Sequence, residues 1–249
     1  MLRGKDVVVE YRGGLKALWK ASFQIPGNKV TCLMGPNASG KTTLLRAVAR
    51  LVEYRGSILI DGLEASRMPL AVLSKILSYG SPTSVSTSLS LRVREILEMA
   101  LYPLKNIDVE KAVEEASMEL DITMLLDRYV GELSSGELQR VVIASALVKN
   151  PRYLLLDEPD AHVDVGFKPV LSRVLRRRAA SSTIVVATHD PVFASCTCDH
   201  VIVLRSGSIV FEGGFDELLE NLGVLEETYG VGFTVSNAPN GRRIILPYY

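Results

Sequence analysis

Short apolar runs alternate along the chain with longer segments in which apolar residues recur at helical spacing. The early apolar runs predict strands over residues 6–10, 22–25 and 29–34. After residue 41, leucine, alanine and valine recur at helical spacing in "KTTLLRAVARLV", which predicts a helix. The pattern over about 68–126 is again helical, apart from the Ser/Thr-rich insert "YGSPTSVSTSLS".

The second half of the chain repeats this alternation around one strongly apolar strand. Residues 134–150 predict a helix, and "RYLLLDEP" follows as an apolar run typical of a strand buried on both faces. A helix over about 164–179, the strand "STIVVATHD" and a hairpin near Ser206 come next, and "VGFTVSNAPNGRRIILPYY" predicts a terminal hairpin that turns at Asn240-Gly241. Strands that alternate with helices predict an α/β fold with a parallel sheet, and the long helical stretch predicts a helical lobe.

Composition argues against nucleic acid as a partner and against membrane insertion. Lys plus Arg and Asp plus Glu balance at 28 each over 249 residues, so no overall basic field favours nucleic acid. The densest basic run, Arg176–Arg178, is interpreted as a solvated helix face. No apolar run approaches the roughly 20 residues that a membrane helix needs. We therefore expect a soluble, cytosolic chain that can dock onto a membrane protein.

Three cysteines, Cys32, Cys196 and Cys198, are too few for a disulfide framework. The C-x-C pair by itself makes a zinc site only a weak hypothesis. We therefore expect unpaired, mostly buried thiols in a reducing cytosol.

The stretch "MGPNASGKTTLL" carries the first candidate chemistry. It matches the pattern G-x-x-x-x-G-K-[ST] between a predicted strand and a predicted helix, which is the context of a phosphate-binding loop. Backbone N–H groups of such a loop and the N-terminus of the helix converge on phosphate oxygens. Lys41 would reach the β- and γ-phosphates of ATP, and the Thr42 hydroxyl would ligate Mg²⁺. The expected nucleotide-binding residues are Gly35, Pro36, Asn37, Ala38, Ser39, Gly40, Lys41, Thr42 and Thr43.

Two adjacent acids complete the expected phosphate site. Asp157 and Glu158 end the apolar run "YLLLDE". An acid at the end of a strand beside the loop would hold Mg²⁺, so Asp157 joins Thr42 as a candidate metal ligand. Glu158 would act as the general base that polarises the attacking water.

The segment "ELSSGELQR", residues 132–140, resembles the signature of ATP-binding cassette (ABC) ATPases, usually written LSGGQ-x-Q/R. The resemblance covers about residues 5–220, with the elements in the family's order. It implies a P-loop NTPase nucleotide-binding domain with a mixed core sheet, an antiparallel β subdomain and a helical lobe. It also implies that Tyr11 stacks on adenine, that Asp164 is the acid of the D-loop "DAHVD", and that His189 contacts the γ-phosphate. The catalytic residues expected on this basis are Lys41, Glu158 and His189.

The signature also has a physical interpretation. Ser134 and Glu137 have the spacing of a capping box, so a helix should begin here with free N–H groups at its tip. The resemblance implies that this tip closes on the γ-phosphate bound by a second copy of the chain, so that two ATP molecules lie between two subunits. The residues expected to act across this dimer are Ser134, Ser135, Gly136 and Glu137.

Three residues depart modestly from the family pattern. Ala38 and Ser135 stand where glycine is common, and Glu137 replaces the signature glutamine. An alanine at position 38 requires a backbone conformation that residues other than glycine can adopt. The hydroxyl of Ser135 would lie where phosphate docks, where it could help or crowd the phosphate.

A larger departure is a missing glutamine. The family places it near residues 81–82, where it contacts Mg²⁺ and relays the nucleotide state to the transport partner. Ser81, Thr83 or Ser84 could offer an oxygen instead. The loss predicts looser metal coordination and slower hydrolysis, with ATP binding intact.

The segment "LRVREILEMALYP" resembles the importers of iron–siderophore, haem or cobalamin, and ATP-driven uptake is the favoured function. In this interpretation residues 1–220 form the ABC domain, with a helical lobe over about 68–145, and 221–249 form a short C-terminal β extension. The expected ligands are ATP and Mg²⁺. The expected partners are a second copy of the chain, integral membrane permease subunits and an extracytoplasmic solute-binding protein. The chain would lie peripherally on the cytoplasmic face of the cell membrane.

Two other functions stay open. A soluble ABC ATPase could use ATP as a switch in assembling other complexes, and it would then co-purify with soluble partners. A regulatory nucleotide-binding subunit with little hydrolysis would fit the missing glutamine.

Overall fold

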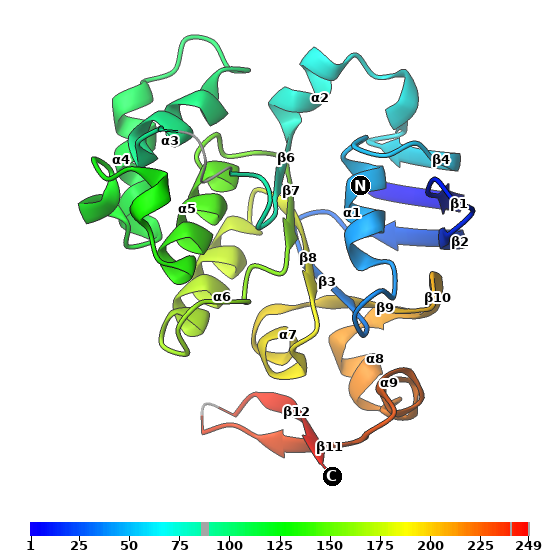
Figure 1. The fold of residues 1–249 in the computed structure, drawn as a ribbon. Coiled ribbons are helices and arrows are strands. Elements are labelled where there is room, and N and C mark those ends of the chain that lie inside the picture. The colour runs from blue at the N-terminus through cyan, green and yellow to red at the C-terminus, as the bar shows by residue number, and fades with distance from the viewer. Residues whose placement is uncertain (86–89, 240, 249) are drawn as a thin grey trace.

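A mixed six-stranded sheet forms the centre of the molecule, of which a computed structural model describes residues 1–85, 90–239 and 241–248 (Figure 1). Its strands are β3 (Val30–Met34), β6 (Leu77–Gly80), β7 (Tyr153–Asp157), β8 (Thr183–Thr188), β9 (His200–Arg205) and β10 (Ser208–Gly214). They lie in the order β10-β9-β3-β8-β7-β6, all parallel except β10, which pairs antiparallel with β9. Every residue of β3, β7 and β8 is buried, which explains why these strands are so apolar in sequence.

The predicted antiparallel sheet lies beside the core sheet (Figure 1). Its strands are β1 (Leu2–Glu10), β2 (Lys16–Ile25), β4 (Arg55–Ile60) and β5 (Leu63–Glu64), in the order β2-β1-β4-β5. Helix α1 (Lys41–Val48) buries Leu44 and Leu45 in one apolar cluster with Ile58 of β4 and Leu155 of β7. This packing fixes the start of α1, and with it the phosphate loop, between the two sheets.

The predicted helical lobe lies on the other side of the core sheet (Figure 1). It contains α3 (Val93–Leu101), α4 (Val109–Glu119), α5 (Ser135–Leu147) and the 3-10 turns η2 (Thr123–Leu125) and η3 (Val130–Glu132). Before it come η1 (Ala65–Arg67) and α2 (Leu70–Ile76), and β6 then interrupts the helical pattern predicted over 68–126. Residues 86–89 of the Ser/Thr-rich insert lie outside the described residues. The limits of the lobe at about 68–145 stay a prediction.

The C-terminal third adds helices and the predicted hairpin. These elements are α6 (Phe167–Arg178), α7 (Pro191–Thr197), α8 (Phe215–Leu219), α9 (Gly223–Tyr229), β11 (Gly232–Asn237) and β12 (Arg243–Tyr248). β11 and β12 pair antiparallel, whereas Asn240 of the expected turn lies outside the described residues. The domain boundary at 220/221 stays a prediction. Among the described residues, no helix is both long and apolar enough to cross a membrane.

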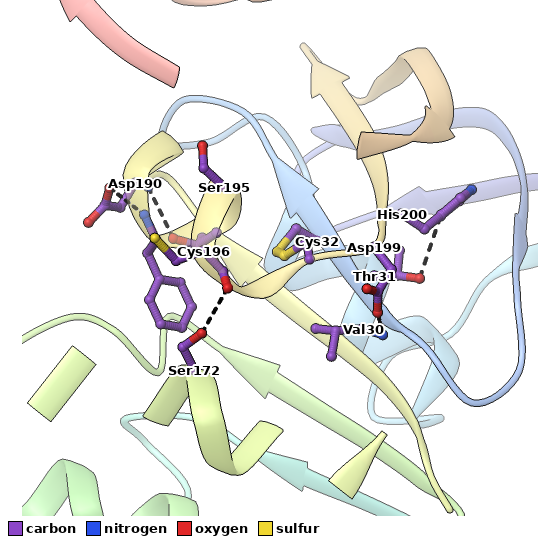
Figure 2. The surroundings of a disulfide bond; sticks show 12 residues. Val30, Thr31, Cys32, Ser172, Asp190, Ser195, Cys196, Asp199 and His200 are labelled. Carbon is purple, nitrogen blue, oxygen red and sulfur yellow. Dashed lines mark hydrogen bonds between the residues drawn. A yellow bond between two sulfur atoms is a disulfide. The ribbon is translucent and has the colours of Figure 1, made fainter. Parts of the chain in front are cut away.

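The prediction of unpaired thiols is wrong for two of the three cysteines. Cys32 on β3 and Cys198 at the end of α7 form a disulfide bond, with their Cα atoms 5.8 Å apart (Figure 2). Both are buried, and Cys196 remains free. The two partners are 166 residues apart in sequence. Spacing alone therefore could not reveal that β3 and the end of α7 pack together.

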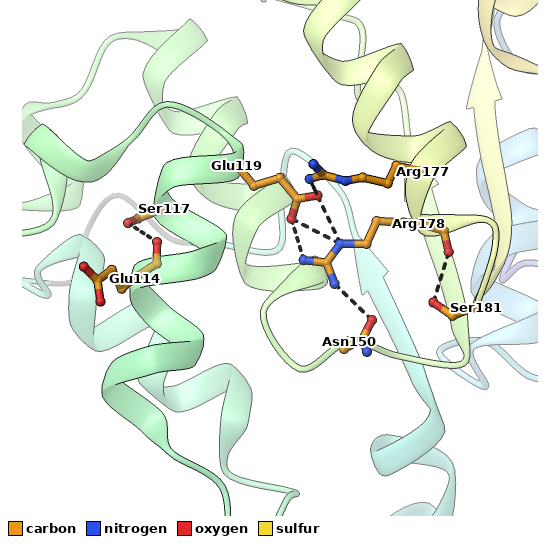
Figure 3. Close-up of polar contacts among 7 residues, drawn as sticks. All are labelled: Glu114, Ser117, Glu119, Asn150, Arg177, Arg178 and Ser181. Atoms are coloured by element: carbon orange, nitrogen blue, oxygen red, sulfur yellow. Dashed lines mark hydrogen bonds and ion pairs between the residues drawn. The ribbon is translucent and has the colours of Figure 1, made fainter.

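The arginine run is likewise more than a solvated helix face. Arg176 is exposed as predicted, but Arg178 of α6 donates from Nε to both carboxylate oxygens of Glu119 on α4, at 3.1 Å each (Figure 3). Arg177 pairs with the same carboxylate. The run thus joins the helical lobe to the core, and the predicted solvated face is wrong for Arg178.

Candidate ATP-binding and hydrolysis site

Backbone conformation shapes the loop between β3 and α1. Gly35 has φ 147° and Gly40 has φ 108°, values that residues with side chains rarely adopt. A Cβ atom at Gly35 would lie 2.3 Å from the Leu204 carbonyl oxygen, and one at Gly40 would lie 2.8 Å from the Ala17 carbonyl oxygen. The two glycines of the motif therefore let the loop wrap closely.

Ala38 lies in the same loop with φ 61°, in the left-handed region. This conformation favours glycine but admits alanine at a cost of about 1 kcal/mol. Ala38 therefore meets the requirement predicted for it, since its backbone is not in a conformation open to glycine only.

Lys41 is buried at the end of the loop and closes it. Its Nζ donates hydrogen bonds to the carbonyl oxygens of Gly35 at 2.6 Å and Pro36 at 2.9 Å. Burial lowers the pKa of Lys41, although nearby carboxylates, Glu158 above all, oppose this shift. Phosphate oxygens in the loop would compete with these backbone oxygens for the ammonium group.

Asp157 at the end of β7 meets Thr42 at the start of α1. Thr42 Oγ1 donates to Asp157 Oδ1 at 3.0 Å, and the Tyr79 hydroxyl of β6 donates to Oδ2 at 3.3 Å. Burial raises the pKa of Asp157 and the charge of Glu158 adds to the shift, whereas both hydroxyl donors oppose it. A hydroxyl and a carboxylate beside a phosphate loop are oxygen donors of the kind that Mg²⁺ prefers, so Thr42 and Asp157 fit this metal.

Three hydroxyl groups could replace the missing glutamine, and they form hydrogen bonds among themselves. Ser81 Oγ lies 3.1 Å from Thr83 Oγ1 and 3.1 Å from Ser84 Oγ. Tyr79, earlier on the same segment, is the residue that contacts Asp157. The sequence did not predict that Tyr79 would donate to Asp157, because an aromatic residue on an apolar strand is usually part of the core.

Glu158 and His189 follow neighbouring strands and lie close together. His189 Nδ1 is 3.7 Å from Glu158 Oε1. The Glu158 backbone is left-handed, with φ 49°, and its N–H donates to the Ala187 carbonyl oxygen at 2.9 Å. Gln139 of α5 donates from Nε2 to the Glu158 carbonyl oxygen at 3.0 Å. This unpredicted contact links the signature helix to the candidate general base.

A cavity of about 450 Å³ opens beside the phosphate loop. Tyr11, Glu158 and the loop and helix residues 37–43 line it, and the Tyr11 hydroxyl lies 3.3 Å from Thr43 Oγ1. Its lining, drawn from the described residues, includes neither the signature residues 134–137 nor His189. The chain therefore brings Tyr11, the loop and Glu158 together at one cavity and leaves the signature outside it.

The signature forms the predicted helix cap. Ser134 Oγ accepts from the Glu137 N–H at 3.3 Å and Glu137 Oε2 accepts from the Ser134 N–H at 2.8 Å, which confirms the capping box. Hydrogen bonds from the backbone and side chain of Ser134 lower the pKa of Glu137, and Arg128 donates to Glu137 Oε1 at 3.2 Å. On the same helix, Arg140 lies 3.7 Å from Asp164. Glu137, which replaces the signature glutamine, thus bonds to Ser134 at the start of its own helix.

Comparison with known proteins identifies the family. A family model described as "ABC transporter" matches residues 18–161, more than half of the chain. The chain belongs to the ABC transporter family. It is 30% identical to the hemin import ATP-binding protein HmuV of Chelativorans sp., over 97% of this chain and 95% of that protein. It is 29% identical to the petrobactin import ATP-binding protein YclP of Bacillus subtilis, over 97% of this chain and 98% of that protein.

Solved structures agree with this assignment. A dimeric post-hydrolysis state of an ATP-binding cassette bound to ADP and Pi matches with a TM-score of 0.77 and 25% identity, over 86% of this chain and 98% of that chain. An ATP-binding subunit of an ABC transporter matches in fold with a TM-score of 0.80 and 23% identity, over 92% and 98% of the two chains. The protein is thus an ATP-binding ATPase of the ABC class, and the predicted fold is confirmed.

Proposed function

We propose that this ABC ATPase drives the uptake of an iron chelate or a related cargo through separate membrane subunits. The support is its similarity, over nearly its whole length, to import proteins whose names specify hemin and petrobactin. Permease subunits would supply the path, an extracytoplasmic solute-binding protein would deliver the cargo, and this chain would lie on the cytoplasmic face of the membrane.

One observation carries the proposed mechanism: the signature tip is not among the described residues that line the cavity. Within one chain the N–H groups at this tip therefore have no nucleotide to bind. A second copy of the chain would place Ser134, Ser135 and Gly136 against the γ-phosphate held by the first. ATP would then hold the two subunits together, because these contacts exist only in the closed dimer.

ATP would bind with its adenine beside Tyr11 and its phosphates in the loop. Lys41 would exchange the Gly35 and Pro36 carbonyl oxygens for oxygens of the β- and γ-phosphates. Thr42 and Asp157 would hold Mg²⁺, which neutralises phosphate charge when bound.

Hydrolysis would follow from the pair Glu158 and His189. Glu158 would accept a proton from water as the water oxygen forms a bond to the γ-phosphorus, while the bond to the bridging oxygen of ADP breaks. His189, 3.7 Å from Glu158, would hold a γ-phosphate oxygen. Release of phosphate and ADP would remove the contacts that keep the dimer closed.

Uptake of radioactive iron, supplied as a siderophore complex or as haem, tests this function in the source cells. Lys41→Ala should reduce uptake at least about tenfold, because the phosphates lose their main cation. Lys5→Ala, an exposed lysine on β1, is the matched control and should leave uptake unchanged. The tagged wild type should also bring down a multi-span membrane protein. Unchanged uptake in Lys41→Ala, with soluble partners only, would refute transport and favour the assembly function.

A further inference from the structure

The C-terminal segment reaches the phosphate loop directly. The Gly35 N–H donates a hydrogen bond of 2.8 Å to the hydroxyl of Tyr229, the last residue of α9. The Tyr229 ring packs edge-on against Phe233 of β11, with the ring centroids 5.7 Å apart. Burial raises the pKa of Tyr229 to about 12, so the hydroxyl keeps its proton at neutral pH. A half-buried, neutral acceptor thus holds the first glycine of the loop.

Gly35 joins this contact to Lys41. Its N–H bonds to Tyr229, and its carbonyl oxygen accepts from Lys41 Nζ at 2.6 Å. The Leu204 carbonyl oxygen lies too close to Gly35 to leave room for a side chain. The Gly35 backbone is therefore oriented by these two hydrogen bonds. Tyr229 therefore acts on the point where the loop leaves β3.

The hairpin beyond α9 contacts α7, the helix that begins just after His189. The Ile245 N–H of β12 donates to Ser195 Oγ of α7 at 2.9 Å, and Ser195 Oγ donates to the Pro191 carbonyl oxygen at 2.6 Å. Asp190 caps α7 through the N–H groups of its first turn, and it follows His189 directly. Figure 2 shows Asp190 and Ser195 on this helix. β12 thus holds the helix that begins beside His189.

Apolar packing makes these contacts part of the fold. Leu225 of α9, Phe233 of β11 and Ile245 of β12 are buried in the same core cluster as Met34, the residue before Gly35. The cluster also contains Phe193 of α7. The C-terminal segment therefore shares one core with β3, which leads into the phosphate loop, and with α7.

We propose that residues 223–239 and 241–248 are part of the scaffold of the ATP site, with Tyr229 positioning the phosphate loop and β12 positioning the segment that carries His189. Tyr229 and Ser195 are positioning residues, because they act through Gly35 and through α7. The proposal rests on the roles proposed above for the loop and His189, and it does not depend on uptake.

Tyr229→Phe in the purified full chain tests the first contact, because it keeps the ring and removes the hydroxyl. KM for ATP should rise about fivefold to tenfold with kcat within about twofold, since a hydrogen bond that orients the loop acts on bound ATP and transition state alike. Hydrogen exchange at the Gly35 amide should accelerate in parallel. Tyr54→Phe is the control, because it loses a hydroxyl bond to Glu64 away from the cavity and should leave KM unchanged.

Ser195→Ala tests the second contact with a different expected signature. It leaves the buried Ile245 N–H without its acceptor, so the start of α7 should shift and kcat should fall about threefold to fivefold, with KM within about twofold. Ser74→Ala, which removes an exposed hydroxyl bond within α2, should change neither constant.

Lys41→Ala, measured in parallel, separates this proposal from the site assignment. If Lys41→Ala loses ATP binding while Tyr229→Phe keeps the wild-type KM and Gly35 exchange rate, the scaffold proposal is overturned and the site stands. A fall in melting temperature in Tyr229→Phe without a change in KM would overturn it equally. If Lys41→Ala binds ATP normally, the site assignment and the scaffold proposal fall together.

Discussion

Both carboxylate oxygens of Asp157 accept hydrogen bonds from hydroxyl groups, Thr42 on one side and Tyr79 on the other. The nearby Tyr79 hydroxyl raises the pKa of the Arg46 guanidinium. The two hydroxyl donors orient the Asp157 carboxylate. We infer that Tyr79 compensates in part for the glutamine that the chain lacks, by holding Asp157 rather than by contacting the metal.

Tyr79→Phe should therefore weaken the response to Mg²⁺ more than the binding of ATP. Without this donor, Asp157 keeps the hydrogen bond from Thr42 but is held less firmly, and the Mg²⁺ concentration for half-maximal ATPase activity should rise about threefold to fivefold. KM for ATP at saturating Mg²⁺ should stay within about twofold. The measurement is a Mg²⁺ titration of the ATPase rate, with Tyr54→Phe as control. An unchanged midpoint would show that the Tyr79 hydroxyl is not needed to orient Asp157.

Helices α4 and α6 meet through one nearly buried carboxylate. The Glu119 side chain is 5% exposed and accepts hydrogen bonds from Arg177 and Arg178 (Figure 3). Burial raises the pKa of Glu119, but the hydrogen bonds and charges of Arg178 and Arg177 outweigh it and hold the pKa below its usual 4.5. This pairing fixes the helical lobe to the core at the end of α4.

Glu119→Gln should reduce the free energy of unfolding at pH 7 by about 2 to 3 kcal/mol, because two arginines lose a charged acceptor. Since the folded pKa lies below the unfolded one, the carboxylate stabilises the fold above about pH 4.5 and loses this effect as the pH falls below it. The difference in the free energy of unfolding between wild type and variant should therefore be smaller at pH 4 than at pH 7. Urea unfolding at both pH values measures it.

Glu114→Gln on the same helix is the matched control. Glu114 is exposed, and its carboxylate has no partner among the described residues, so the free energy of unfolding should change by less than about 0.5 kcal/mol. A difference for Glu119→Gln that stays constant from pH 7 to pH 4 would contradict the ion pair as its source.

Elements built from local patterns were predictable, and contacts between distant elements were not. The phosphate loop and the cap at Ser134 each depend on residues a few positions apart, where backbone geometry makes a pattern specific. The Gly35–Tyr229 bond joins residues 194 positions apart, and a single sequence does not record which elements meet.

On the scale of the whole molecule, the described residues include two helix N-termini suited to an anion. One follows the phosphate loop at α1, where Lys41 and the cavity lie. The other is the signature tip at α5, where Arg128 pairs with Glu137 and where none of residues 134–137 is among the described residues that line that cavity. A phosphate carried by another molecule would satisfy the second tip, and a symmetric pair of chains would satisfy both at once.

Glu158→Gln in the presence of ATP and Mg²⁺ should therefore convert the purified chain from monomer to dimer in light scattering. Glutamine cannot accept the proton from water, so ATP persists and keeps the contacts that only the dimer makes. The double variant Glu158→Gln with Lys41→Ala should stay monomeric, because it retains the same signature but lacks the cation that holds the phosphates. A Glu158→Gln protein that binds ATP yet remains a monomer would show that the signature tip has another ligand. The composite site, and with it the role of ATP in joining two chains, would then have to be abandoned.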